Sequence, residues 1–402
     1  MELVTLADIV KARKTIQPVI KETGLYNCSK LGRMIEGEVF LKLENLQRTG
    51  SFKLRGACNK IANLSAEEKA HGVIASSAGN HAQGVAYSAT RLGIPATVVM
   101  PATAPLSKVQ ATKDYGATVV LEGSVYDDAY AKARELQIES GATFLHPFDD
   151  KDVIAGQGTI MLEIFDKIPD VDVVIVPIGG GGIIAGIATA AKALNPNIRV
   201  IGVEAINAPC MTRAIEQGEC VEVQVKSSIA DGIAVRKAGA LTYEHVVNYV
   251  DEIVTVTESE IARGILFLME KDKIIAEGAG SVSVAAILSG KLELKGKKVA
   301  AIISGGNVDI NMMERIMNLA LIAEGRRVDL KIRIFDKPGE LEKIVKLISD
   351  ENINILQLNQ SMYKNDIDLG QQEVEFVLEC FGHEHRDGLF RKLVDFGYKL
   401  FK

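Results

Sequence analysis

Residues 173–191 read Val-Val-Ile-Val-Pro-Ile-Gly-Gly-Gly-Gly-Ile-Ile-Ala-Gly-Ile-Ala-Thr-Ala-Ala and contain no charged side chain. The stretch is long enough to cross a bilayer as a helix. Pro177 and four consecutive glycines interrupt it, however, and both residue types disfavour a helix interior. A buried strand over 173–178, a tight turn at the glycines and a helix over 183–194 explain the pattern better than a membrane span.

The same strand–turn–helix order recurs on both sides of this stretch, from about residue 70 to residue 320. The strand-length runs are apolar without alternation, which indicates burial on both faces, as in parallel sheets covered by crossover helices. Before the stretch, we predict strands over 72–75, 96–100, 117–121 and 142–145, with helices over 80–92, 106–115 and 125–139. After it, we predict strands over 199–203, 253–256 and 299–303, with helices over 209–217, 258–271, 279–288 and 310–323. These two blocks predict two α/β lobes with a cleft between them.

The pattern changes after Gly325-Arg326-Arg327. The remaining segments read as a strand over 328–335, a helix over 341–349, strands over 354–363 and 373–380, a helix over 385–396 and a strand over 398–401. The order β-α-β-β-α-β is typical of a ferredoxin-like unit, which packs two helices on one face of an antiparallel sheet. We therefore predict a separate C-terminal domain.

The composition indicates a soluble protein of two or three domains. The chain has 402 residues, of which 47% are hydrophobic and 24% charged, and its net charge is −6. An acidic balance argues against nucleic-acid binding, which needs a basic face. Five scattered cysteines without a Cys-x-x-Cys spacing favour a reducing compartment, and residues 1–8 lack the order of a signal peptide. We expect a cytoplasmic protein without a membrane or nucleic-acid partner.

The glycine run is a candidate phosphate cradle. Four residues without a Cβ, Gly179, Gly180, Gly181 and Gly182, let the backbone approach an anion, and the helix expected from Ile183 points free N–H groups at it. A tight turn alone would also use glycine, but four in succession carry a large entropic cost. The run also fits the dinucleotide pattern Gly-x-Gly-x-x-Ala, with Glu204 at the end of the next strand as a candidate ribose-binding acid. A nicotinamide-dependent dehydrogenase is therefore the alternative.

Three further segments carry chemistry-bearing residues at predicted helix starts or strand ends. Ser51-Phe52-Lys53-Leu54-Arg55-Gly56 enters a helix, where partial burial and the helix dipole would lower the pKa of a lysine. Ser77-Ala78-Gly79-Asn80-His81 joins a strand to a helix and suits a carboxylate, although Asn80 could simply cap the helix. Ser304-Gly305-Gly306-Asn307 ends another strand, where a simple turn is equally compatible with the residues.

Together with the glycine run, these segments resemble, in the same order, the fold-type II pyridoxal-phosphate enzymes, and most of all the threonine dehydratases (threonine ammonia-lyases). The resemblance covers residues 5–322 and implies a tryptophan-synthase-β-like fold with two open α/β lobes. The tail is similar to an ACT domain, a regulatory amino-acid-binding module, with Asp336-Lys337-Pro338-Gly339 at the place of its effector loop. It implies a catalytic domain over 1–322, with a small lobe at about 46–146 and a large lobe of 1–45 and 147–322. An ACT-like domain would follow over 327–402.

The resemblance also implies a role for each matching residue. Lys53 would hold pyridoxal 5′-phosphate covalently and act as the base, with Phe52 beside the cofactor ring. Asn80 would hydrogen-bond the phenolic oxygen, and Ser304 would face the pyridine nitrogen. The phosphate would lie on the loop formed by Gly179, Gly180, Gly181, Gly182 and Ile183. The substrate carboxylate would lie on the loop formed by Ser77, Ala78, Gly79 and His81.

The implied reaction is β-elimination, which converts L-threonine to 2-oxobutanoate and ammonia, and L-serine to pyruvate. The related serine racemases carry a serine as second acid/base where this chain has Ala78, so the substitution predicts poor racemisation. Those racemases also place an acidic metal ligand where this chain has Cys210, so we expect no divalent metal. The tail implies a small-molecule effector and a homo-oligomer. A non-catalytic amino-acid sensor is a third hypothesis, which predicts no turnover.

Overall fold

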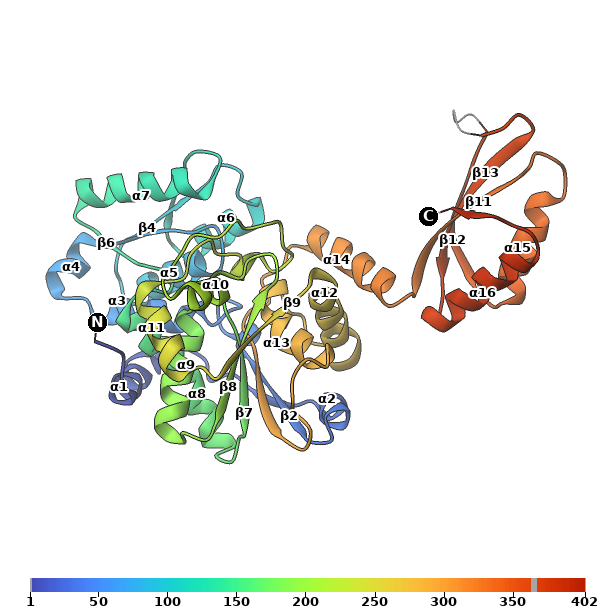
Figure 1. The fold of residues 1–402 in the computed structure, drawn as a ribbon. Helices are drawn as coiled ribbons and strands as arrows, with labels where there is room; N and C mark the ends of the chain where they lie inside the picture. The colour runs from blue at the N-terminus through green and yellow to red at the C-terminus, as the bar shows by residue number, and fades with distance from the viewer. Residues whose placement is uncertain (1, 363–366, 402) are drawn as a thin grey trace. The chain divides into compact units, whose positions relative to one another are not determined.

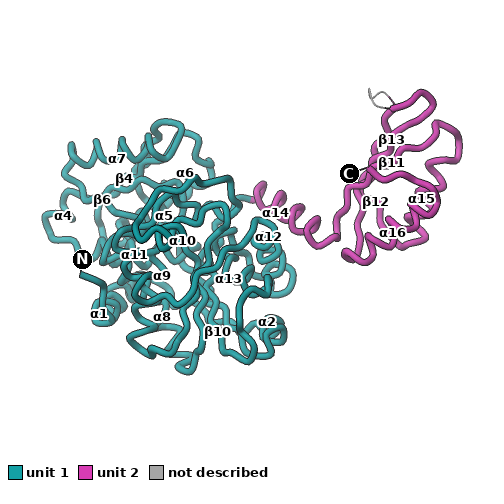
Figure 2. The backbone as a smooth tube through the Cα atoms, in the orientation of Figure 1, with its two compact units in different colours: residues 1–309 teal, residues 310–402 magenta. Residues whose placement is uncertain are grey.

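The computed structural model describes residues 2–362 and 367–401. The chain divides into two compact units, residues 1–309 and residues 310–402 (Figure 2). The second unit begins with α14 (Ile310–Ala323), whereas the sequence analysis counts this helix with the catalytic domain up to residue 322. The side chain of Arg327 bonds that of Asn318, which ties α14 to the strand that follows it. The assignment of residues 310–322 to the catalytic domain stays a prediction, since these residues pack with the second unit.

The large lobe of the first unit is built on a six-stranded sheet in the order β1-β2-β10-β7-β8-β9 (Figure 1). Its strands are β1 (Leu25–Asn27), β2 (Glu38–Leu43), β7 (Val173–Pro177), β8 (Arg199–Ala205), β9 (Glu252–Val256) and β10 (Lys298–Ile303). All neighbouring pairs are parallel except β1 with β2. All five residues of β7 are buried, as the uncharged run predicts for a strand that is covered on both faces.

Helices cover both faces of this sheet (Figure 1). They alternate with its strands along the chain, as expected for crossover connections. They are α1 (Leu6–Ile16), α2 (Ser29–Met34), α8 (Lys151–Lys167), α9 (Gly182–Leu194), α10 (Cys210–Gln217), α11 (Ala240–Tyr249), α12 (Glu258–Phe267) and α13 (Gly278–Leu288). Short 3₁₀-helices lie at η1 (Glu44–Leu46) and η2 (Asp231–Ile233), and a π-helix, η3 (Leu268–Asp272), follows α12. Thirteen successive residues of α9 contain only Lys192 as a charge, and ten of them are buried, which places this helix in the core.

The small lobe contains a four-stranded parallel sheet in the order β5-β4-β3-β6. Its strands are β3 (Val73–Ser76), β4 (Ala96–Met100), β5 (Thr118–Leu121) and β6 (Thr143–Phe144). Its helices are α3 (Lys53–Asn63), α4 (Ala66–His71), α5 (Asn80–Arg91), α6 (Leu106–Asp114) and α7 (Tyr126–Ser140). The two lobes and the parallel strands predicted within them are therefore confirmed, with ends that differ by one or two residues.

The second unit has the predicted order of elements. After α14 come β11 (Arg327–Phe335), α15 (Glu340–Asp350), β12 (Asn354–Ser361), β13 (Gln371–Glu379), α16 (His383–Asp395) and β14 (Leu400–Phe401). The antiparallel sheet has the order β12-β13-β11-β14. The strand predicted over 354–363 ends at Ser361, and Tyr363 lies outside the described residues. Leu330, Ile332, Ile344, Phe376 and Leu389 lie in a core of the unit's own.

A buried ion cluster fixes the helix that Lys53 begins. Arg55 is fully buried, and its guanidinium donates to Glu44 of η1 at 2.8 Å and to Glu163 of α8 at 2.6 Å. Lys42 of β2 donates to the same Glu163 at 2.5 Å. Two cations face two carboxylates, so the cluster is neutral and its charges are mutually compensated. Helix α3 is thereby tied to three elements of the large lobe.

Several elements give no clear signal in the sequence analysis, among them β1, β2, α8 and α11. Strand β1 has only three residues, and α8 is buried along most of its length, so its apolar residues are not confined to one helical face. Among the described residues, no helix is both long and apolar enough to cross a membrane. The uncharged stretch 173–191 is instead divided between β7, the glycine turn and α9.

Candidate active site

Lys53 is the first residue of α3, and its side chain is half-buried. The Nζ atom donates to the carbonyl oxygen of Pro147 at 2.9 Å and lies 5.3 Å from the centre of the Phe52 ring. Burial lowers the pKa of the Lys53 amine to about 8, while the nearby carboxyl of Glu277 opposes this shift. Desolvation penalises the ammonium form, so a larger fraction of this amine is neutral near pH 7 than for an ordinary lysine.

The four glycines join β7 to α9 and leave a row of backbone donors free. Gly181 adopts a φ of +97°, a conformation that glycine reaches without strain, and it precedes the first residue of α9. In the part of the chain that the structure describes, no N–H from Gly179 to Ile184 donates to a backbone oxygen. Free donors at a helix N-terminus favour an anion, as the sequence predicts for this loop.

The glycines are also required by close packing beneath the loop. A Cβ atom at Gly180 would lie 2.4 Å from ring carbons of Phe148, and one at Gly182 would lie 2.9 Å from the Cβ of Phe148. Phe148 directly follows Pro147, the residue whose carbonyl binds Lys53. Residues 147 and 148 therefore connect the amine to the glycine loop, and the two predicted features belong to one site.

The segment from Ser77 to His81 joins β3 to the first turn of α5, as predicted. Gly79 donates its N–H to the hydroxyl of Ser77 at 3.2 Å, and α5 begins at Asn80. Within the described residues, the N–H groups of the first three residues of α5 donate to no backbone oxygen. Ala78 is half-buried and packs against the core of the small lobe. This helix start can therefore accept a carboxylate through its backbone donors.

The side chain of His81 does not take part in carboxylate binding, because it already bonds the backbone. Its Nε2 atom lies 3.0 Å from the carbonyl oxygen of Leu145, and a carbonyl can only accept, so Nε2 carries the proton. Burial and, to a lesser extent, the charge of the Lys53 amine lower the pKa of His81 to about 3. The imidazole is therefore neutral, and its hydrogen bond to the Leu145 carbonyl gives it a structural role. Only its backbone N–H remains for an anion.

Ser304 lies beside Phe52 at the carboxyl end of β10. Phe52 donates its N–H to the Ser304 carbonyl at 3.0 Å, and the buried Ser304 hydroxyl donates to the carbonyl of Ala279 at 3.2 Å. The neighbouring Gly305 forms a β-bridge with Ser51. The carboxyl ends of β3, β7 and β10 thus all lead into segments with predicted site residues, as expected at the edge of parallel sheets.

Two polar residues of the site were missed by the sequence analysis. Glu277, directly before α13, accepts a hydrogen bond from the Asn80 Nδ2 atom at 2.7 Å. Asn307 donates to the Asn80 Oδ1 atom at 2.8 Å. Asn307 belongs to a quoted motif, but it received no role. Glu277 precedes Gly-Ala-Gly-Ser at the start of a predicted helix, and the isolated acid among small residues was the available signal.

The nucleotide-binding alternative depends on Glu204, and the structure gives this residue another function. Its carboxylate is fully buried and accepts bonds from the N–H groups of Met211 at 2.7 Å and Thr212 at 2.9 Å. Glu204 therefore stabilises the start of α10, and its oxygens are already used. A ribose would have to displace these bonds, so the predicted dehydrogenase alternative is not supported.

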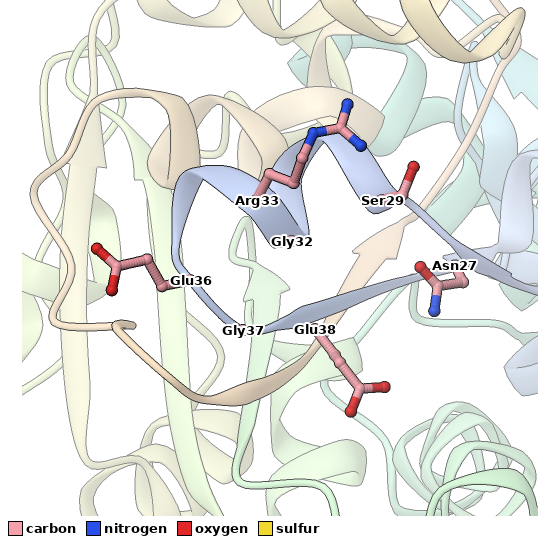
Figure 3. A pocket seen from close by; sticks show the side chains of 7 residues that line it. All are labelled: Asn27, Ser29, Gly32, Arg33, Glu36, Gly37 and Glu38. Atoms are coloured by element: carbon pink, nitrogen blue, oxygen red, sulfur yellow. The ribbon is translucent and has the colours of Figure 1, made fainter.

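A separate surface pocket lies between α2 and β2 (Figure 3). It is lined by Asn27, Ser29, Gly32, Arg33, Glu36, Gly37 and Glu38. None of these residues belongs to the predicted site. The chemistry-bearing residues described above lie instead where the two lobes meet.

Comparison with known proteins places this geometry in context. The sequence profile of the family described as "Pyridoxal-phosphate dependent enzyme" matches residues 16–305. The chain is 49% identical over 398 residues to an L-threonine ammonia-lyase of Thermotoga maritima, covering 99% of each sequence. Among solved structures, the processed threonine deaminase isoform 2 of Solanum lycopersicum superimposes with a TM-score of 0.75 at 38% identity, covering 78% of this chain and 92% of that one. The maize serine racemase has the same TM-score at 34% identity, covering 79% of this chain and 97% of that one.

Proposed function

The chain belongs to the pyridoxal-phosphate-dependent enzyme family, and on this premise we propose that it removes water and ammonia from L-threonine. The products are 2-oxobutanoate and ammonia, and the enzyme is a carbon–nitrogen lyase. A relative with this activity matches along the whole chain, which the sensor hypothesis does not explain. The observation that carries the proposal is the desolvated Lys53 amine, which is linked through residues 147 and 148 to a glycine loop with free N–H groups.

The residues that lie where the two lobes meet fit pyridoxal 5′-phosphate. The donors from Gly179 to Ile184 suit its phosphate, because they lack backbone acceptors and lie at a helix start. Lys53 would hold the aldehyde covalently, with Phe52 beside the ring. The Asn80 amide would donate to the ring oxygen. The Ser304 hydroxyl, which donates to the Ala279 carbonyl in the structure, would rotate to donate to the pyridine nitrogen. A hydroxyl can donate to an uncharged pyridine nitrogen, whereas a carboxylate, which only accepts, would require that nitrogen to carry a proton.

The bound cofactor would supply the electron sink that makes the α-proton of the amino acid acidic. The protein supplies the base and the orientation. The Nζ atom of Lys53 takes the α-proton, since its lowered pKa leaves a usable neutral fraction near physiological pH. The start of α5, with Ser77, Ala78 and Gly79 before it and the N–H of His81 within it, binds the substrate carboxylate. The neutral imidazole of His81 does not compete for that charge.

L-serine, which lacks only the γ-methyl group of threonine, is the expected second substrate and would give pyruvate. Ala78 has no proton to deliver to the face opposite Lys53, so racemisation should be poor. The position of Ala78 supports this assignment, because its methyl group is half-buried and packs against the apolar core of the small lobe.

The second unit is proposed as an ACT-like regulatory domain over residues 327–402. Its βαββαβ order, with the strand order β12-β13-β11-β14, supports a ferredoxin-like unit. The loop Asp336-Lys337-Pro338-Gly339 between β11 and α15 is the proposed effector segment. From this assignment we expect the second unit to bind a small-molecule effector, such as a branched-chain amino acid. We also expect the protein to form a homo-oligomer. The role is either isoleucine biosynthesis or threonine catabolism.

Three measurements test these proposals. Purified protein with the cofactor should form 2-oxobutanoate from L-threonine, and borohydride should attach the cofactor to Lys53, as located by peptide mass. Absence of turnover with the cofactor bound would contradict the lyase. Assays with and without isoleucine or valine test the second unit. Rates and KM values that no effector changes would contradict its regulatory role.

A further inference from the structure

The carboxyl group of Glu277 is unusual in its position. Glu277 is the residue before α13, yet its side chain does not cap that helix. It is 5% exposed, and its Oε1 atom accepts from the Nδ2 atom of Asn80 at 2.7 Å, although the two residues are 197 positions apart. An acid before a helix ordinarily binds the N–H groups of its first turn. This one instead binds a side chain of the opposite lobe.

The direction of the hydrogen bonds around Asn80 is determined by a backbone carbonyl. The carbonyl of Thr49 can only accept, so the group of Asn307 that faces it at 2.7 Å is Nδ2. The same nitrogen donates to the Asn80 Oδ1 atom at 2.8 Å. The Nδ2 atom of Asn80 must then face Glu277, which accepts one of its two protons. The other proton remains available to a further acceptor.

Glu277 lies among charges from several elements. Burial and the charge of Asp231 of η2 together raise its pKa to about 7, against the opposing effects of the bond from Asn80, the charge of Lys108 of α6 and the N–H of Asn307. Lys108 and Asp231 form an ion pair at 3.1 Å. The Glu277 charge in turn raises the pKa of Lys53. Both forms of the carboxyl are therefore populated near neutral pH, within range of the amine.

We propose that Glu277 is a positioning residue of the lyase reaction, which holds the Asn80 amide with its second N–H directed to the cofactor's ring oxygen and makes the site responsive to pH. This inference rests on the proposed function. The geometry of the Thr49–Asn307–Asn80–Glu277 chain carries it: Glu277 holds the nitrogen end of the Asn80 amide, and removal of this acceptor leaves the amide held only at its oxygen by Asn307. A cofactor that loses this donor is held less firmly and changes its absorption.

The test uses the full-length, cofactor-loaded protein and the variants Glu277→Gln and Glu277→Ala. Gln keeps an oxygen for Asn80 but cannot titrate, whereas Ala removes the acceptor. The cofactor absorption of wild type should change with pH around a midpoint near 7, because burial raises the pKa of Glu277 to about 7. E277Q should lack this transition. E277A should bind the cofactor about 10- to 100-fold more weakly, the loss expected for a bond to a charged group. Its kcat should fall while KM for threonine changes little.

Glu260→Gln is the matched control. The Glu260 carboxylate accepts from the N–H of Thr257 at 2.7 Å and pairs with Lys291, so it stabilises α12 without contact to the site. E260Q should keep the spectral transition and the affinity for the cofactor. The same pH transition in E277Q as in wild type would overturn the proposal.

A third variant covers a failure of E277Q or E277A to fold. Glu277→Asp keeps the charge but withdraws the carboxyl from Asn80 by one methylene, so its cofactor affinity and spectrum should change. Wild-type behaviour of E277D would overturn the positioning role. Failure of the wild type to bind the cofactor or to deaminate threonine would instead contradict the proposed function itself, so the two failures are distinguishable.

Discussion

The Nζ atom of Lys53 donates to the carbonyl oxygen of Pro147 at 2.9 Å. This bond joins the first residue of α3 to the segment that returns the chain to the large lobe. Phe148, the next residue, packs beneath Gly180 and Gly182. The position of the amine therefore depends on the conformation of the glycine loop. A substitution that displaces one of them should also displace the other.

Lys53→Ala should abolish deamination and covalent attachment of the cofactor, yet stabilise the cofactor-free chain. The pKa of the amine is lowered to about 8 in the folded protein, from an ordinary 10.5, so folding penalises the ammonium form. The cost is present below pH 8 and disappears as the pH rises towards 10.5. Urea unfolding of the cofactor-free protein at pH 7 should show the gain. The exposed Lys11→Ala should show neither effect, and activity in K53A would contradict the assignment.

Gly180→Ala should weaken cofactor binding, because its new Cβ would lie 2.4 Å from the Phe148 ring and displace the loop or the ring. We expect a loss of at least about tenfold in affinity, measured by fluorescence titration with the cofactor, as for a lost hydrogen bond or two. Gly388→Ala is the control, since a Cβ there meets no atom within 4 Å and lies in helix α16. G388A should be more stable by about 0.5–1 kcal/mol. Unchanged cofactor affinity in G180A would exclude the loop as the cradle.

Arg55→Met should destabilise the protein by about 3–5 kcal/mol, because it leaves the buried carboxylate of Glu44 without a cationic partner and that of Glu163 with Lys42 alone. Glu44 and Glu163 both depend on this guanidinium. Arg13→Ala breaks an exposed pair with Asp166 and should cost about 0–1 kcal/mol. Denaturant unfolding of the three proteins at pH 7 gives the comparison. A difference below about 1 kcal/mol between the two variants would mean that the cluster adds no stability.

Acid should weaken the fold before most carboxyl groups titrate. Burial lowers the pKa of His81 to about 3 and that of His245 to about 4. For a depressed pKa, the stabilisation is present above the ordinary value of 6.5 and is lost as the pH falls towards the folded value. Each histidine should therefore contribute up to about 1.4 kcal/mol of loss per pH unit below 6.5. Unfolding free energies at pH 6.5 and 5.5 test this.

His245→Gln provides the internal check on that slope. The imidazole accepts from the N–H of Val4 and lies 2.9 Å from the Thr189 hydroxyl, contacts that an amide can partly replace without a titrating group. The variant should be less stable at pH 7 but lose less stability between pH 6.5 and 5.5. A slope equal to that of the wild type would assign the acid sensitivity to other groups.

Much of the fold was accessible from local patterns. Buried strands such as β7 read as unbroken apolar runs, and α9 and α14 begin within a residue of their predicted starts. Local patterns were less informative where burial removes periodicity, as in α8, or where a strand is too short, as in β1. The glycine pattern alone could not distinguish a phosphate loop from a nucleotide site. The bonds of Glu204 to α10 decided that question.

The sequence by itself determined which residues stand at helix starts and strand ends, because capping, glycine and apolar runs act over a few neighbouring positions. It placed Lys53 before a helix and four glycines before another. Only the tertiary structure decided that Glu277 meets Asn80 across 197 residues and that residues 147 and 148 lie between the amine and the loop. Such pairings depend on how two lobes pack, and packing is the sum of many distant contacts that no local pattern encodes.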